Sequence, residues 1–165
     1  MTAPVSVTQA LEAKFGTRVD KKMVEAFRSA WPDGVPLAYG EGGPIIGNLH
    51  VFFTVQGTDL AKSLAPYAVS EAGLYVGHHQ KSGMFKKTPA VKFFPTKSIA
   101  SVKRGLKRDP DGSVWRSMTL IGTRGEALCE MTSFSSAGIA TDFAHTAMRD
   151  LAMGLGLPID EEFDF

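Results

Sequence analysis

The chain has 165 residues, of which 44% are hydrophobic and 21% charged, and its formal net charge is +1. These proportions are typical of one folded globular domain and exclude wholesale disorder. The single cysteine, Cys129, excludes an internal disulfide. Because no apolar run approaches the roughly 20 residues of a membrane span and no secretory leader is recognisable, we expect a cytoplasmic protein whose membrane contact would be peripheral.

The small net charge conceals a segregation of charge along the chain. Residues 71–124 contain eleven basic and three acidic side chains, whereas residues 125–165 contain one basic and eight acidic ones. Two solvated faces that attract each other in the fold would account for this pattern. An anion-binding surface in the middle of the chain would account for it equally well, and the sequence leaves both interpretations open.

Helical spacing dominates the beginning of the chain. Ser6 and Gln9 resemble the capping box of a short first helix. A second helix, capped by Asp20 and ended by Pro32, carries apolar residues at helical spacing: Met23, Val24, Phe27 and Trp31. We therefore expect residues 1–34 to form a helical pair packed on the core.

From position 35 the apolar period changes from 3.6 to 2, which is typical of strands. "GEGGP", "DPDG" and "TRG" mark turns between several of these segments. The predicted strands lie at 35–39, 49–55, 67–79 with a break at 71–73, 90–94, 98–102, 113–122 and 126–134. Short strands in succession favour a barrel or sandwich over alternating βαβ units.

The clearest helical pattern follows the strands, at residues 140–151. Phe143 and Leu151 share its apolar face and would point into the strand assembly, and Gly154 is placed to terminate it. The last residues, 158–165, form an acidic tail, "PIDEEFDF", for which little structure is expected. Such a tail could also fold back on basic loops or enter a partner's groove.

The order of these segments resembles bacterial pleckstrin-homology-like (PH-like) domains. The runs that carry the resemblance are "GLYVGHH", "VKFFPTKSIASVKRG", "SMTLIGT", "EALCEMTSF" and "IATDFAHTAMRDLAMGL". The resemblance implies an α+β, mostly β fold over residues 35–157: a PH-like antiparallel β-barrel or sandwich of about seven strands capped by a C-terminal α-helix. The family's lipid-binding pattern of basic residues in the first hairpin is missing, because "GEGGP" carries an acidic residue instead.

The sequence gives little support for a metal site, a catalytic nucleophile or a nucleotide-binding site. Strand alternation places His78 and His79 on opposite faces, so they could not readily share an ion. Cys129 lies on the same face of its predicted strand as apolar residues, so we predict that it is a small buried side chain. No zinc motif, nucleophile elbow or phosphate-binding loop is present. We therefore expect a non-enzymatic protein without a metal or cofactor.

Basic residues between positions 81 and 108 are the candidates for binding. In the predicted hairpin after His79, free amides near Gly83 could cradle an anion. The residues that we predict to contact an anion or a partner are Lys81, Lys86, Lys87, Lys92, Lys103, Arg104, Lys107 and Arg108.

Protein–protein interaction, as an adaptor, is the leading functional interpretation. Peripheral binding of anionic lipid headgroups, or of other phosphate-bearing ligands, is the first alternative. Single-stranded nucleic acid is the second, since aromatic residues interleave with the lysines: Phe85, Phe93, Phe94 and Trp115. An open sheet edge would also allow two copies to pair as a homodimer.

Overall fold

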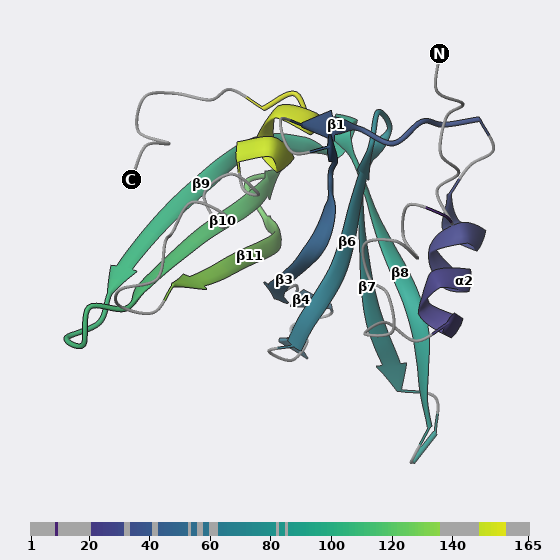
Figure 1. The fold of residues 1–165 in the computed structure, drawn as a ribbon, viewed down its shortest axis with the longest axis horizontal. Coiled ribbons are helices and arrows are strands. Elements are labelled where there is room, and N and C mark those ends of the chain that lie inside the picture. Colours follow the sequence, from purple (N-terminus) through teal and green to yellow (C-terminus); the bar gives the residue numbers. More distant parts are fainter. Residues whose placement is uncertain are drawn as a thin grey trace.

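The protein is mostly β, with antiparallel strands, and the predicted fold class is confirmed at that level (Figure 1). The computed structural model describes residues 9, 21–31, 34–40, 43–52, 54–55, 58–59, 63–81, 83–84, 86–135 and 149–157. The first predicted helix and the acidic tail lie outside these ranges, Gln9 excepted.

The second predicted helix is present as α2, Lys21–Ala30. The strands that follow are β1 (Tyr39–Gly40), β2 (Gly43–Pro44), β3 (Ile46–Phe52), β4 (Thr54–Val55), β5 (Thr58–Asp59), β6 (Ser63–Ser70), β7 (Gly73–Lys81), β8 (Lys87–Pro95), β9 (Ile99–Arg108), β10 (Val114–Gly122) and β11 (Ala127–Ser135). A 3-10 helix, η2 (Thr96–Ser98), joins β8 to β9, and residues 149–154 are helical.

One seven-stranded sheet contains the long strands, in the order β8-β7-β6-β3-β11-β10-β9. Two meanders, β6 to β8 and β9 to β11, are joined because β3 pairs with both β6 and β11. The small pairs β1-β2 and β4-β5 stand apart from this sheet. In Figure 1 the two meanders meet at one end and diverge towards the other.

A closed barrel, which the sequence pattern suggested, is not formed. The margins of the sheet, β8 and β9, are consecutive in the chain and meet only through η2. Pro89 and Pro95 in β8 have no N–H to donate, so this strand cannot offer an unbroken ladder to β9. The result is a strongly curved open sheet with two free margins among the described strands.

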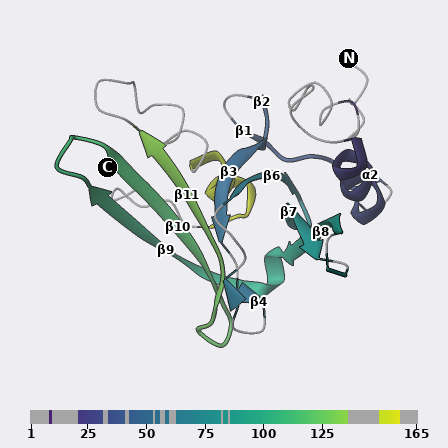
Figure 2. The ribbon, with the colours of Figure 1, turned by 90° about the horizontal axis from the view of Figure 1, so that it is seen from below.

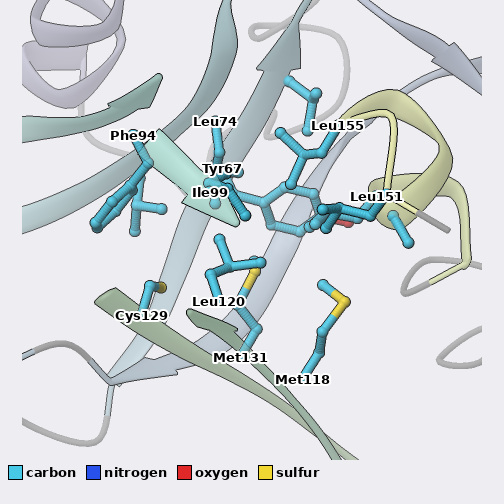
Figure 3. Packing of buried hydrophobic residues seen from close by; sticks show 14 of the residues in the cluster. Tyr67, Leu74, Phe94, Ile99, Met118, Leu120, Cys129, Met131, Leu151 and Leu155 are labelled. Carbon is cyan, nitrogen blue, oxygen red and sulfur yellow. The ribbon is translucent and has the colours of Figure 1, made fainter. Parts of the chain in front are cut away.

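The inner face of the curved sheet holds the larger core. The strict alternation of buried and half-buried residues along β10 shows that only one face of this strand is covered. The buried residues of this cluster are Ile45, Ala65, Tyr67, Val69, Leu74, Val76, Phe94, Ile99, Met118, Leu120, Cys129, Met131, Leu151, Ala152, Leu155 and Leu157. Leu151 and Leu155 bring the C-terminal helix onto this face, beside Tyr67 (Figure 3).

The C-terminal helix ends two residues later than the sequence indicated. Gly156 has φ +69°, and the N–H of Leu157 donates to the carbonyl of Ala152 at 2.9 Å, which is a Schellman ending. Gly154 has a different role: a Cβ there would lie 2.7 Å from Cδ1 of Ile45. It is a point of close helix-to-sheet contact. Of the predicted inward-facing residues, Leu151 is confirmed as buried, while Phe143 lies outside the described residues.

The outer face of β6, β7 and β8 is covered by α2. A second cluster joins Met23, Val24, Phe27 and Trp31 to Leu37, Ile46, Ala68 and Tyr75. Trp31 stacks on Tyr75 at 4.4 Å between ring centroids, and Tyr75 stacks on Phe93 at 4.6 Å. The indole N–H of Trp31 donates to the carbonyl of Val35 at 2.7 Å, which ties the chain after the helix to the same cluster.

Candidate functional site

The basic residues predicted to bind fall into separate places rather than one rim. Lys81, Lys86 and Lys87 surround the tip of the β7–β8 hairpin. Lys103, Arg104, Lys107 and Arg108 follow one another along β9, at the opposite margin of the sheet. Figures 1 and 2 both place the free ends of these two hairpins far apart across the open sheet.

Both margins of the sheet belong to a part of the chain that contains no acidic residues. Between Ala72 and Arg108 the chain has nine Lys or Arg and no Asp or Glu. This interval comprises β7, β8 and β9, and therefore both outer strands of the sheet. A run of one sign of charge on neighbouring elements produces a positive potential that attracts anionic partners.

The basic residues of β9 are divided between the two faces of the sheet. Arg104 and Arg108 lie opposite the inward-facing Met118 and Val114, so they belong to the inner face. By the same register, Lys103 and Lys107 lie opposite Thr119 and Trp115 on the outer face. Lys103, Lys107 and Arg108 are exposed, and Arg104 is half-buried. The strand therefore carries positive charge on both of its faces.

The free end of β9 is fixed by a tight turn. The N–H of Gly112 donates to the carbonyl of Asp109 at 3.0 Å, and Gly112 has φ +87°. The Asp109 carboxylate accepts the indole N–H of Trp115 at 2.9 Å and lies 3.6 Å from the ammonium of Lys107. Since the Lys107 side chain is 76% exposed, this ion pair adds little stability, and the Asp109 carboxylate offsets part of the positive charge at this end of β9.

Lys92, also predicted to bind, lies on the inner face of the sheet, opposite Val76. It is half-buried in β8, with its ammonium 5.5 Å from the ring centroid of Phe94. Burial first, and then the Lys92 and His79 charges, lower the pKa of His78. Lys92 therefore packs against Phe94 on the inner face, separate from the exposed basic residues of the two hairpins.

The β7–β8 hairpin ends in an exposed methionine. Met84 is 92% exposed, Gly83 has φ +86°, and Lys86 is exposed beside them. Lys81 and Lys87 are register partners at the last pair of the ladder. A single exposed apolar side chain is ordinary on a protein surface, so what distinguishes Met84 is its position at the hairpin tip beside basic residues.

The thiol and the imidazoles have no catalytic geometry among the described residues. Cys129 is 1% exposed, and burial raises the pKa of its thiol to about 12. His78 is half-buried on the inner face while His79 is exposed, as strand alternation requires. Within the described ranges no group of three or more His, Cys, Asp or Glu is arranged to hold a metal ion.

Of the aromatic residues proposed to stack nucleobases, Phe93, Phe94 and Trp115 do not share a surface, and Phe85 lies outside the described residues. Phe94 is 4% exposed on the inner face, whereas Phe93 stacks on Tyr75 on the outer face. Trp115 lies across the sheet in β10 with its indole N–H bonded to Asp109. Adjacent residues of a strand point to opposite faces, so interleaving in the sequence scatters the rings in space.

The feature that sequence reasoning missed is the position of β9 at a sheet margin. The sequence shows that β8 contains prolines and that β9 contains none. This difference indicates where another strand could pair only once both strands are known to be outermost. No protein-family model matches the chain, and no curated protein or solved structure matches it significantly. Among the described helices, none combines the length and the apolar character that crossing a bilayer requires.

Proposed function

We propose that this protein is a non-enzymatic binding module that recognises an acidic region of a partner protein through β9. The observation that carries the proposal is the set Lys103, Lys107 and Arg108, exposed on both faces of an outermost strand. A PH-like fold is part of the same proposal. It is supported by the strand order, in which β3 pairs with β11, and by the helix on the inner face.

The arrangement favours fast and selective association over high affinity. An exposed ion pair contributes about 0.2 to 1 kcal/mol, so a few such pairs alone give only weak binding. Charge of one sign over a surface raises association rates, and this effect falls steeply with ionic strength. An adaptor that exchanges partners suits these properties.

Binding of a labelled decaglutamate peptide, followed by fluorescence anisotropy, tests the proposal. We expect binding in 50 mM salt that weakens in 300 mM salt. Replacing Lys103 and Arg108 together by glutamine should lower the affinity by about fivefold or more, at about 0.5 to 1 kcal/mol for each charge. Replacing the exposed Lys21 of α2 is the control and should change little. Equal affinity of both variants would contradict the assignment to β9.

A second candidate function is attachment to an anionic membrane through the β7–β8 hairpin. Met84, 92% exposed at the tip, is the observation that favours it, because an apolar tip between lysines can enter a headgroup layer. Each basic residue near an anionic surface contributes about 1 kcal/mol. The lysines and the methionine together would give reversible attachment.

Sedimentation with vesicles tests this second function. We expect binding to vesicles with 30% phosphatidylserine and none to pure phosphatidylcholine. Met84→Ser should weaken the binding several-fold, whereas Met153→Ser, which alters a methionine 47% exposed on the C-terminal helix, should not. If both variants sediment like the wild type, the hairpin is not the attachment point.

A further inference from the structure

We infer that β9 binds its partner by strand addition: an extended acidic segment joins the sheet as a further strand beside β9. The inference rests on the proposed function and specifies its geometry. Strand addition requires a sheet margin whose backbone groups can pair with another strand. It also requires charges that favour the partner strand and that disfavour pairing between two copies of this chain. The described residues address each requirement.

Among the described residues, no strand pairs with the outer side of β9, whereas prolines interrupt the backbone donors of β8. β9 is the last strand in the sheet order, and β10 is the only described strand that pairs with it. All ten of its residues, Ile99–Arg108, have a backbone N–H, because the strand contains no proline. β8, the other margin, contains Pro89 and Pro95. Every second residue of β9 directs its N–H and C=O away from β10, so among the described outermost strands β9 offers an incoming strand a row of donors and acceptors that no proline interrupts.

The charges of β9 select an acidic strand. Lys103 and Arg104 are adjacent and so lie on opposite faces, and the same holds for Lys107 and Arg108. Side chains of an added strand also alternate between the faces, and opposite charges at cross-strand positions are favourable. An incoming strand would match this pattern in either direction if it carried two adjacent acidic residues, then two residues of any other kind, and then two more adjacent acidic residues.

Gly105 separates the two outer-face lysines of β9 in the sequence and packs against β10. It lies opposite Ser117, and a Cβ at this position would collide with the hydroxyl of that serine. The outer face of β9 therefore has no side chain between Lys103 and Lys107. The glycine thus marks the close approach of Ser117 from β10, and the two outer-face lysines have no β9 side chain between them to separate their charges from an incoming strand.

The same charges oppose pairing of two β9 margins. Pairing this strand with a copy of itself would bring like charges together, which destabilises a sheet. Positive residues on an outermost strand are also a common device against unwanted association. The charge pattern therefore disfavours a homodimer in which two β9 strands pair with each other.

The test uses a labelled peptide with the matching pattern, Thr-Val-Glu-Glu-Val-Thr-Glu-Glu-Val-Thr, and two N-methylated forms. One form carries the methyl groups on the odd-numbered amides and the other on the even-numbered amides. All three peptides have the same charge and side chains. Only one set of amides can face β9 in a given register, so we expect one methylated form to bind at least tenfold more weakly. The unmodified peptide should also protect amides of β9 from hydrogen exchange.

Each outcome decides between the two proposals. If both methylated forms bind as tightly as the unmodified peptide, strand addition is overturned while recognition of an acidic partner stands. If no acidic peptide binds to the folded protein, the proposed function and the strand addition fail together. Replacing Lys103 and Arg108 by glutamine should weaken the unmodified peptide about fivefold or more, and Lys21→Gln should leave it unchanged. Equal effects of the two changes would also overturn the inference.

Discussion

Truncation of Leu151 to alanine tests how much the C-terminal helix stabilises the curved sheet. Leu151 is 0% exposed and lies in the cluster that contains Tyr67 and Met118. The change removes three buried carbon groups, which at about 0.8 kcal/mol each corresponds to about 2.4 kcal/mol of transfer free energy. The cavity that remains adds to this, so we expect a loss of about 3 to 4 kcal/mol in the free energy of unfolding.

Urea denaturation followed by tryptophan fluorescence measures this loss. The matched control is Met153→Ala, which changes a residue of the same helix that is 47% exposed and should cost about 1 kcal/mol or less. A loss below about 1 kcal/mol for Leu151→Ala, similar to that of the control, would refute the packing of the helix on the inner face. An altered slope with denaturant would point instead to a changed unfolded or native state.

Three further outcomes follow from individual sites. Gly156→Ala should destabilise the protein by about 1 kcal/mol in thermal denaturation, because φ +69° is unfavourable for alanine; an unchanged midpoint would contradict the helix ending. Burial, and then Asp150, raise the pKa of Tyr67 from 10.0 to about 12. The unfolded chain therefore loses this proton first, so stability should fall as the pH rises from 10 to 12, and Tyr67→Phe should reduce that fall. Cys129, buried with its pKa raised to about 12, should react slowly with a thiol reagent at pH 8 and rapidly in urea; fast labelling of the native protein would exclude its burial.

Local features of the fold were predictable because they depend on neighbouring residues. The switch to a two-residue period located most of the long strands, and the predicted break at 71–73 is the turn between Ser70 and Gly73. Two predicted ranges were wrong: β9 continues to Arg108 instead of ending at 102, and residues 35–39 contribute only a bridge at Leu37 and the first residue of β1. The pattern of α2 was equally clear, since Met23, Val24 and Phe27 are its buried residues. Alternation also gave the opposite faces of His78 and His79.

Long-range features were not predictable from the same pattern. Alternation shows that a strand has two faces, but it does not show which strands are outermost or whether the margins close. The end of the C-terminal helix illustrates the same limit: Gly154 and Gly156 look alike in the sequence, and only the proximity of Ile45 separates a contact glycine from a terminating one. For the same reason Lys92 could not be distinguished from the exposed lysines.

The two margins of the sheet limit pairing with further strands in different ways. This difference is the reason why we assign partner binding to β9. An outermost strand exposes backbone groups that invite another strand. In β8 the prolines remove donors, and the aromatic stack through Phe93 and Tyr75 ties the strand to its neighbour. In β9 no proline removes a donor, and the strand carries positive charge on both faces. The missing donors of β8 weaken pairing with any incoming strand, whereas the positive charge of β9 repels basic strands and attracts acidic ones, so β9 selects an acidic partner.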